Sequence, residues 1–204
     1  MAYGHYESPP GSTDGIARRD SASTKIVISG GFGAGKTTFV GTVSEIMPLR
    51  TEALVTNASQ GLDGLSATPQ KNTTTVAMDF GRITLAEDLV LYLFGTPGQR
   101  RFWFMWDDLV RGAIGAVVLV DTRRLADCFA AVDFFEDRNL PYVLGVNCFD
   151  GVLSHSLRDV AEALALDPAV PVVTVDARDR ESTKDALIAL VEHAMQVWAV
   201  GARA

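Results

Sequence analysis

The stretch that decides the fold is Gly30-Gly31-Phe32-Gly33-Ala34-Gly35-Lys36-Thr37. It fits the pattern G-x-x-x-x-G-K-[ST], in which a glycine-rich turn joins a strand to a helix. Glycines let the backbone bend closely around an anion and point several N–H groups at it. The helix that begins at the lysine adds the positive end of its dipole. The sequence therefore predicts a phosphate-binding turn. The alternative, a tight turn beside a solvent-exposed lysine, has less support because the chain holds only four lysines.

Short apolar runs alternate with helical stretches on both sides of this turn. We expect strands at 26–29, 76–85, 89–94, 115–121, 142–147 and 170–176, and helices at 36–47, 126–138, 157–166 and 182–200, the last capped by Ser182. This alternation predicts an α/β fold of three layers with a mostly parallel six-stranded sheet, in which the 76–94 hairpin supplies one antiparallel strand. Ligands of such sheets bind at the carboxyl ends of the strands.

Composition and charge narrow the class of protein. The formal net charge of −7 disfavours a nucleic-acid backbone or an anionic membrane as the main partner. Residues 1–24 are rich in Gly, Ser, Pro and Thr and are predicted to be a disordered tail, which leaves 25–204 as one domain. No apolar run approaches the roughly 18 residues of a membrane span. We therefore expect a cytoplasmic protein without direct membrane insertion, recruited to a membrane only through a partner.

Four further motifs lie at or beside the predicted strands. They read TTTVAMDF over 73–80, GTPGQRRF over 95–102, NCFD over 147–150 and DAR over 176–178. In this order they resemble the switch I threonine, the D-x-x-G-Q, the N-K-x-D and the S-A-K elements of small Ras-superfamily GTPases. The first two are more narrowly similar to bacterial Ras-like GTPases of actinobacterial conservon operons, which are related to the gliding-motility polarity GTPase. The resemblance covers about residues 25–200.

This resemblance implies a Ras-like P-loop NTPase that binds GTP or GDP with Mg²⁺, hydrolyses GTP slowly and acts as a switch. It assigns the phosphates to residues 30–37 and Thr38, and the metal to Thr37 and Thr75. Lys36 and the backbone N–H of Gly98 would contact the γ-phosphate, and Gln99 would orient the attacking water. The base loops would be Asn147, Cys148 and Asp150 together with Asp176, Ala177 and Arg178.

Within those base loops, the resemblance gives three residues separate roles. Asp150 would accept two hydrogen bonds from the guanine edge. The Ala177 N–H would meet guanine O6. Asn147 would brace the base loop against the phosphate turn.

Two positions depart from the family pattern. Gly95 replaces the aspartate that holds Mg²⁺ through water, and Asp79 on the neighbouring strand is the candidate to replace it. Cys148 replaces the lysine that packs against the base, which predicts modest nucleotide affinity and weaker support for guanine over adenine.

Several alternatives stay open. Arg100 could stabilise charge during hydrolysis, or be one of two solvated arginines. The three threonines at 73–75 could simply be strand formers. The aromatic run 102–106 could be core, or a surface for a regulatory or effector protein at switch II. The resemblance implies roadblock-type proteins as such partners. An ATP-using P-loop enzyme and a non-hydrolysing nucleotide-binding scaffold are the other two functions.

Overall fold

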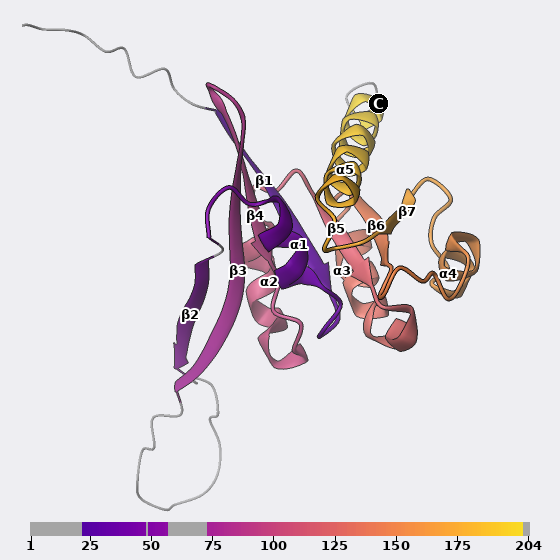
Figure 1. Ribbon diagram of the computed structural model, residues 1–204, viewed down its shortest axis with the longest axis horizontal. Coiled ribbons are helices and arrows are strands. Elements are labelled where there is room, and N and C mark those ends of the chain that lie inside the picture. The colour runs from indigo at the N-terminus through magenta and orange to yellow at the C-terminus, as the bar shows by residue number, and fades with distance from the viewer. Residues whose placement is uncertain (1–21, 48, 57–72, 202–204) are drawn as a thin grey trace, which may run out of the picture.

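The computed structural model describes residues 22–47, 49–56 and 73–201 (Figure 1). The strands form a sheet in the order β2-β3-β4-β1-β5-β6-β7. Their bounds are β1 Ala22–Gly30, β2 Leu49–Thr56, β3 Thr73–Ala86, β4 Leu89–Gly95, β5 Gly115–Val120, β6 Tyr142–Asn147 and β7 Val172–Val175. The helices are α1 Lys36–Val43, α2 Trp106–Val110, α3 Phe129–Asp137, α4 Leu157–Ala163 and α5 Arg180–Gly201, with 3-10 helices η1 Arg100–Met105 and η2 Thr122–Asp127.

The direction of the strands confirms the mostly parallel α/β sheet. β1 runs parallel to β4 and β5, and β5, β6 and β7 are parallel in turn. β3 is antiparallel to both of its neighbours, β2 and β4, so it alone runs against the rest. The sheet also has a strand beyond the six that were expected. This is β2, which adds an edge next to β3, and the two extend away from the helices as a long hairpin (Figure 1).

Two apolar clusters cover the two faces of the sheet. Ile26 and Ile28 of β1 pack with Phe39 of α1 and the apolar side of α5 in one cluster. Val27, between them in the sequence, points into the other cluster, which includes Phe135 of α3 and residues of α2 and α4. Successive strand residues face opposite sides, so the fully buried β1 run is explained by helices on both faces.

Several element boundaries differ from the expected ones. β1 begins at Ala22, so residues 22–24 belong to the sheet and not to the tail; the rest of the predicted tail lies outside the described residues. α1 ends at Val43 instead of 47, because Ser44 turns to an extended conformation while its N–H still bonds to the helix. α5 begins at Arg180, where the Asp179 carboxylate accepts from the Ser182 N–H at 2.7 Å, so Asp179 is the cap and Ser182 is not.

Three other elements are shorter than expected. α4 ends at Ala163, β7 is confined to Val172–Val175, and the predicted 126–138 helix is split, with η2 occupying its first residues and α3 starting at Phe129. No helix in the part of the chain that the structure describes has the length and apolar character needed to span a bilayer. Because β1, β4, β6 and β7 are parallel, the loops that follow them all lie at one edge of the sheet.

Candidate functional site

The glycine-rich turn is held in shape by contacts that exclude side chains. Gly30 has φ +132°, and a Cβ there would lie 2.3 Å from the carbonyl oxygen of Leu119 on β5. Gly35 has φ +105°, and a Cβ there would lie 2.6 Å from the side-chain nitrogen of Asn147. Both positions therefore require glycine for backbone conformation and for space. Side chains would also disturb the turn where it packs on β5 and on the loop after β6.

Lys36 places a buried ammonium group inside this turn. Its Nζ donates to the carbonyl oxygens of Gly30 at 2.9 Å and Gly31 at 2.6 Å, and the residue is only 8% exposed. Burial lowers its pKa to about 8, and the negative charge of Asp79 opposes that shift. An ammonium group that is out of water and bonded to neutral carbonyls is stabilised by an incoming anion. The residues of the turn thus fit a phosphate group.

The loop after β4 closes against the phosphate turn. A Cβ on Gly98 would lie 2.9 Å from Lys36 Nζ and 2.9 Å from the backbone nitrogen of Phe32, so only glycine fits. Two bonds hold this loop: the Thr96 N–H donates to Ile28 at 2.9 Å, and the Trp106 indole N–H donates to Pro97 O at 3.3 Å. Gln99 follows Gly98 and is exposed. Gln99 is therefore exposed to solvent one residue after Gly98, which contacts Lys36.

Thr37 and Asp79 form the polar pair that fits a hydrated divalent cation. The Thr37 hydroxyl donates to Asp79 Oδ2 at 2.7 Å. A Cβ on Gly95 would lie 3.0 Å from Asp79 Cβ and 3.1 Å from Asp79 Oδ2. The Asp79 carboxylate therefore lies against Gly95, in the space that a side chain at position 95 would otherwise fill. Oxygen donors of this kind suit Mg²⁺.

Thr75 lies on the strand β3, on the same strand as Asp79. It is paired with Leu54 of β2 and stands four residues before Asp79 on a continuous strand. At about 3.3 Å per residue, the strand separates Thr75 from Asp79 by roughly 13 Å. The expected Thr37–Thr75 metal pair therefore stays a prediction, since the structure places Thr75 only by its register on the β2–β3 hairpin. The side chain of Arg100 lies outside the described part of the structure.

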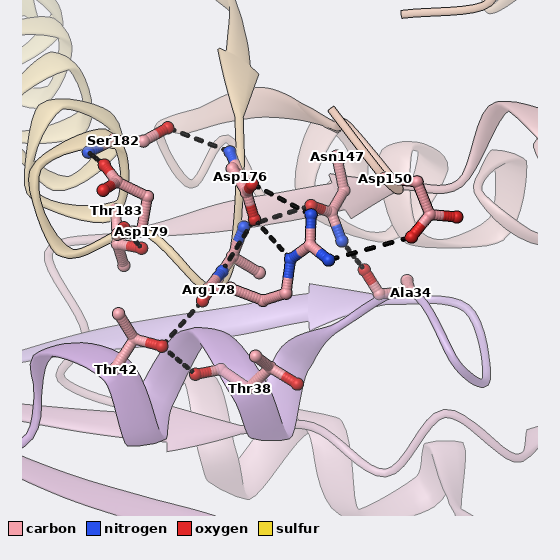
Figure 2. Close-up of polar contacts among 11 residues, drawn as sticks. Ala34, Thr38, Thr42, Asn147, Asp150, Asp176, Arg178, Asp179, Ser182 and Thr183 are labelled. Atoms are coloured by element: carbon pink, nitrogen blue, oxygen red, sulfur yellow. Dashed lines mark hydrogen bonds and ion pairs between the residues drawn. The ribbon is translucent and has the colours of Figure 1, made fainter. Parts of the chain in front are cut away.

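Asn147 joins the phosphate turn to the base loop. Its amide nitrogen donates to the Ala34 carbonyl at 3.0 Å, and its amide oxygen accepts from the Ala177 N–H at 3.1 Å (Figure 2). Both partners have a fixed polarity, so the orientation of the amide is determined. This contact is a correction for Ala177: its N–H was expected to meet guanine O6, but Asn147 already occupies it.

The remaining base-loop residues surround an ion-pair network. Arg178 contacts Asp176 through Nε at 3.0 Å and lies near Asp150, with Nη1 3.8 Å from Asp150 Oδ1 (Figure 2). The Arg178 bonds hold the pKa of the Asp176 carboxyl below its usual range. Cys148 is buried, and burial raises the pKa of its thiol. Of the phosphate-turn residues, Phe32, Gly33, Thr37 and Thr38 are exposed.

Arg124 lies beside the phosphate turn and was not among the predicted site residues. Arg124 donates to the Phe32 carbonyl at 3.3 Å and pairs with Asp127 at 2.6 Å. A Cβ on Gly31 would lie 2.7 Å from Asp127 Cβ, so η2 packs directly on the turn. The available signal was the position of Arg123 and Arg124 just after the buried strand β5, where this fold places functional groups.

The aromatic run after Gln99 divides between core and surface. Trp106 is 2% exposed and its ring packs on Phe134 and Phe135, with centroids 5.1 and 6.4 Å away. Phe102 is also buried, whereas Phe104 is 60% exposed. The core expectation is therefore confirmed for Phe102 and Trp106, and a partner surface at Phe104 stays a prediction. Buried Trp106 anchors the loop that carries Gln99, while Phe104 faces solvent.

The fold resembles that of solved GTPase structures. The chain matches solved small-GTPase structures, among them Arl6 (BBS3) of Trypanosoma brucei with bound GppNp (TM-score 0.59, 15% identity, 86% of this chain and 99% of that one). The G domain of the T. maritima FeoB iron transporter is comparable (TM-score 0.58, 15% identity, 85% and 99%). At these identities, the match shows a P-loop GTPase fold.

Sequence comparison adds one relative and a family. An uncharacterized protein of Methanocaldococcus jannaschii is 29% identical over 128 residues, which are 62% of this chain and 70% of the relative. A family model described as conserved hypothetical ATP binding protein matches residues 28–197. That span includes the phosphate turn, both base loops and most of the sheet. The chain is a nucleotide-binding P-loop protein and belongs to this family of conserved hypothetical ATP-binding proteins.

Proposed function

We propose that this protein binds GTP and hydrolyses it slowly to GDP and phosphate, as a regulatory switch. The observation that carries the proposal is the Asn147 amide, which joins Ala34 of the phosphate turn to Ala177 of the turn after β7. Asp150 lies three residues beyond Asn147 with its carboxylate in solvent. One rigid contact thus ties a phosphate-binding turn to a carboxylate that suits the guanine edge.

The phosphates would be held by the glycine-rich turn and Lys36. The Lys36 ammonium would exchange its two carbonyl partners for phosphate oxygens, and the turn would supply backbone N–H groups. Thr37 and Asp79 would hold Mg²⁺, which, when bound, neutralises charge on the β- and γ-phosphates. The packing of Asp79 beside Gly95 supports Asp79 as the replacement for the missing aspartate.

Hydrolysis would proceed by in-line attack of water on the γ-phosphorus. The bond from the γ-phosphorus to the β–γ bridging oxygen breaks, and GDP leaves with that oxygen. Gln99 would orient the water, because it follows Gly98 at the surface above Lys36. Lys36 would stabilise the charge on the phosphoryl group. Arg100, which directly follows Gln99, is the candidate for further charge stabilisation.

The switch would use the loop from Gly95 to Leu109 and the β2–β3 hairpin. The 95–109 loop contacts Lys36 through Gly98 and exposes Phe104 to solvent. An exposed aromatic side chain suits the binding of a regulatory or effector protein, including one of roadblock type. Thr75 would reach the metal only if the 73–78 part of β3 separates from β2. A partner could then distinguish the GTP and GDP forms by the state of these two segments.

An adenine nucleotide is the second candidate ligand. The family description names ATP. In addition, Cys148 stands where the Ras-like guanine-binding pattern has a lysine. In that case the same phosphate turn would serve an ATPase or an ATP-dependent enzyme. A third possibility, a scaffold that binds nucleotide without turnover, predicts binding with no phosphate release.

Single-turnover hydrolysis tests the proposal. Purified protein is mixed with limiting γ-labelled GTP or ATP and Mg²⁺, and phosphate release is followed for the natural chain, Gln99→Leu and Gln196→Leu. Gln196 is an exposed glutamine on α5 and serves as the matched control. We expect release from GTP in the natural chain and the control and a large loss in Gln99→Leu. Faster release from ATP, or equal rates in all three proteins, would contradict the proposal.

A further inference from the structure

The turn after β7 leaves no free backbone donor for a base. The Asp176 N–H donates to the Ser182 hydroxyl at 2.9 Å, the Ala177 N–H to Asn147 at 3.1 Å and the Arg178 N–H to Asp176 Oδ1 at 3.0 Å. Guanine carries an acceptor, O6, next to the N1–H that Asp150 would bind. A buried or half-buried acceptor without a donor weakens binding. The donor for O6 must therefore come from a side chain.

Arg178 has a donor free at the right place. Its Nε and Nη2 are engaged by the two oxygens of Asp176 at 3.0 and 3.1 Å. Its Nη1 lies 3.8 Å from Asp150 Oδ1, which is too far for a hydrogen bond (Figure 2). The two groups form a long ion pair without a hydrogen bond, and both side chains are open to solvent, Arg178 at 56% and Asp150 at 90% exposure. A planar edge that offers a donor and an acceptor side by side would fit both.

We propose that Arg178 Nη1 donates to guanine O6 while Asp150 accepts from guanine N1–H and the 2-amino group, so that this pair sets the preference for guanine over adenine. The inference rests on the proposed guanine-nucleotide function. It assigns to an arginine side chain the contact expected from the Ala177 backbone.

The pair discriminates because adenine reverses both groups. Adenine has an acceptor at N1, which would face the Asp150 carboxylate, and an amino donor at position 6, which would face the Arg178 guanidinium. Each contact would become repulsive and leave a polar group unpaired, and this penalises the wrong base as well as favouring the right one. Arginine also suits O6, since guanine O6 and N7 are its most frequent targets among base atoms.

Asp176 makes the arrangement ready for binding. Its bidentate contact fixes the plane of the guanidinium group, so little side-chain freedom remains to be lost when the base arrives. The Asp150–Arg178 pair costs little to separate because it is long and exposed. The weak Asp150–Arg178 pair is thus easily separated by a base, while the Asp176–Arg178 hydrogen bonds keep the guanidinium group in place.

Calorimetry with two ligands and three proteins tests the inference. GDP and 6-thio-GDP, in which sulfur replaces O6 as a poor acceptor, are titrated into the natural chain, Arg178→Ala and Arg180→Ala. Arg180 is an exposed cation two residues away that contacts the Thr42 carbonyl, so it is the matched control. We expect the natural chain and the control to bind GDP about tenfold more tightly than 6-thio-GDP, the scale of one charged hydrogen bond.

In Arg178→Ala, GDP affinity should fall about tenfold and the GDP to 6-thio-GDP ratio should approach one. Unchanged GDP affinity would overturn the inference, because a backbone donor would then read O6. A loss of affinity with the ratio preserved would also overturn it, because Arg178 would then only stabilise the turn. If the alanine variant does not fold, Arg178→Met keeps the length of the side chain without a donor and gives the same comparison. ADP is titrated into the natural chain as a separate control, and tighter binding of ADP than of GDP would instead refute the proposed function itself.

Discussion

Replacing Asn147 with alanine should uncouple the phosphate turn from the base loop. The amide makes two buried hydrogen bonds, to the Ala34 carbonyl and from the Ala177 N–H, and the residue is 6% exposed. Asn147→Ala removes both and leaves a buried carbonyl and N–H without these partners. Losing such bonds and leaving orphaned groups costs about 1–2 kcal/mol each, so we expect a loss of roughly 2–4 kcal/mol. For a domain of this size, that lowers the melting temperature by roughly 5–15 °C.

Urea unfolding and thermal melting of the protein without nucleotide measure this loss directly. Asn147→Asp is the matched variant, because it keeps the acceptor for Ala177 but turns a carboxylate oxygen toward the Ala34 carbonyl. We expect it to be as unstable as Asn147→Ala at pH 7, and to recover stability relative to the alanine variant as the pH falls and its carboxyl becomes protonated. If Asn147→Ala unfolds within 0.5 kcal/mol of the natural chain (about the scatter of neutral surface changes), the amide does not couple the loops.

Three other changes test the phosphates, the metal and the base. Burial lowers the Lys36 pKa to about 8 and bound phosphates would raise it, so GDP affinity should weaken as pH rises from 7 to 9, by up to about tenfold per unit above pH 8; a flat profile would contradict the role of Lys36. Asp79→Ala should weaken GDP binding about tenfold in Mg²⁺ but not in EDTA, and equal losses in both would exclude Asp79 from the metal site. Asp150→Asn should shift preference from GTP toward XTP in competition binding, whereas an unchanged preference would mean that Asp150 does not contact the base.

The phosphate turn was predictable because its backbone conformation requires glycine at fixed positions in the chain. Gly30 and Gly35 adopt positive φ, a local backbone requirement that the glycine pattern alone marks. The strand ends that carry Gln99 and Asp150 followed from apolar runs of the right length. These features depend on neighbours in the chain, which a single sequence records.

The features that were not predicted depend on contacts between distant segments. The edge strand β2 exists through its pairing with β3, in which Thr75 lies opposite Leu54. The Ala177 N–H bonds to an amide thirty residues earlier in the chain, so its loss as a base donor is visible only in the fold. Asp179 is the helix cap in place of Ser182 because the Asp179 carboxylate accepts from the backbone N–H of Ser182, which lies inside the first turn.

The central claim is that one rigid site binds the phosphates and reads guanine. Calorimetric titration of the purified natural chain with GDP and with ADP, in Mg²⁺ at pH 7, tests it most directly. The account predicts saturable binding of GDP and binding of ADP at least about tenfold weaker, since two polar contacts with adenine would be reversed. Equal or tighter binding of ADP would contradict it, as would the absence of heat with both nucleotides.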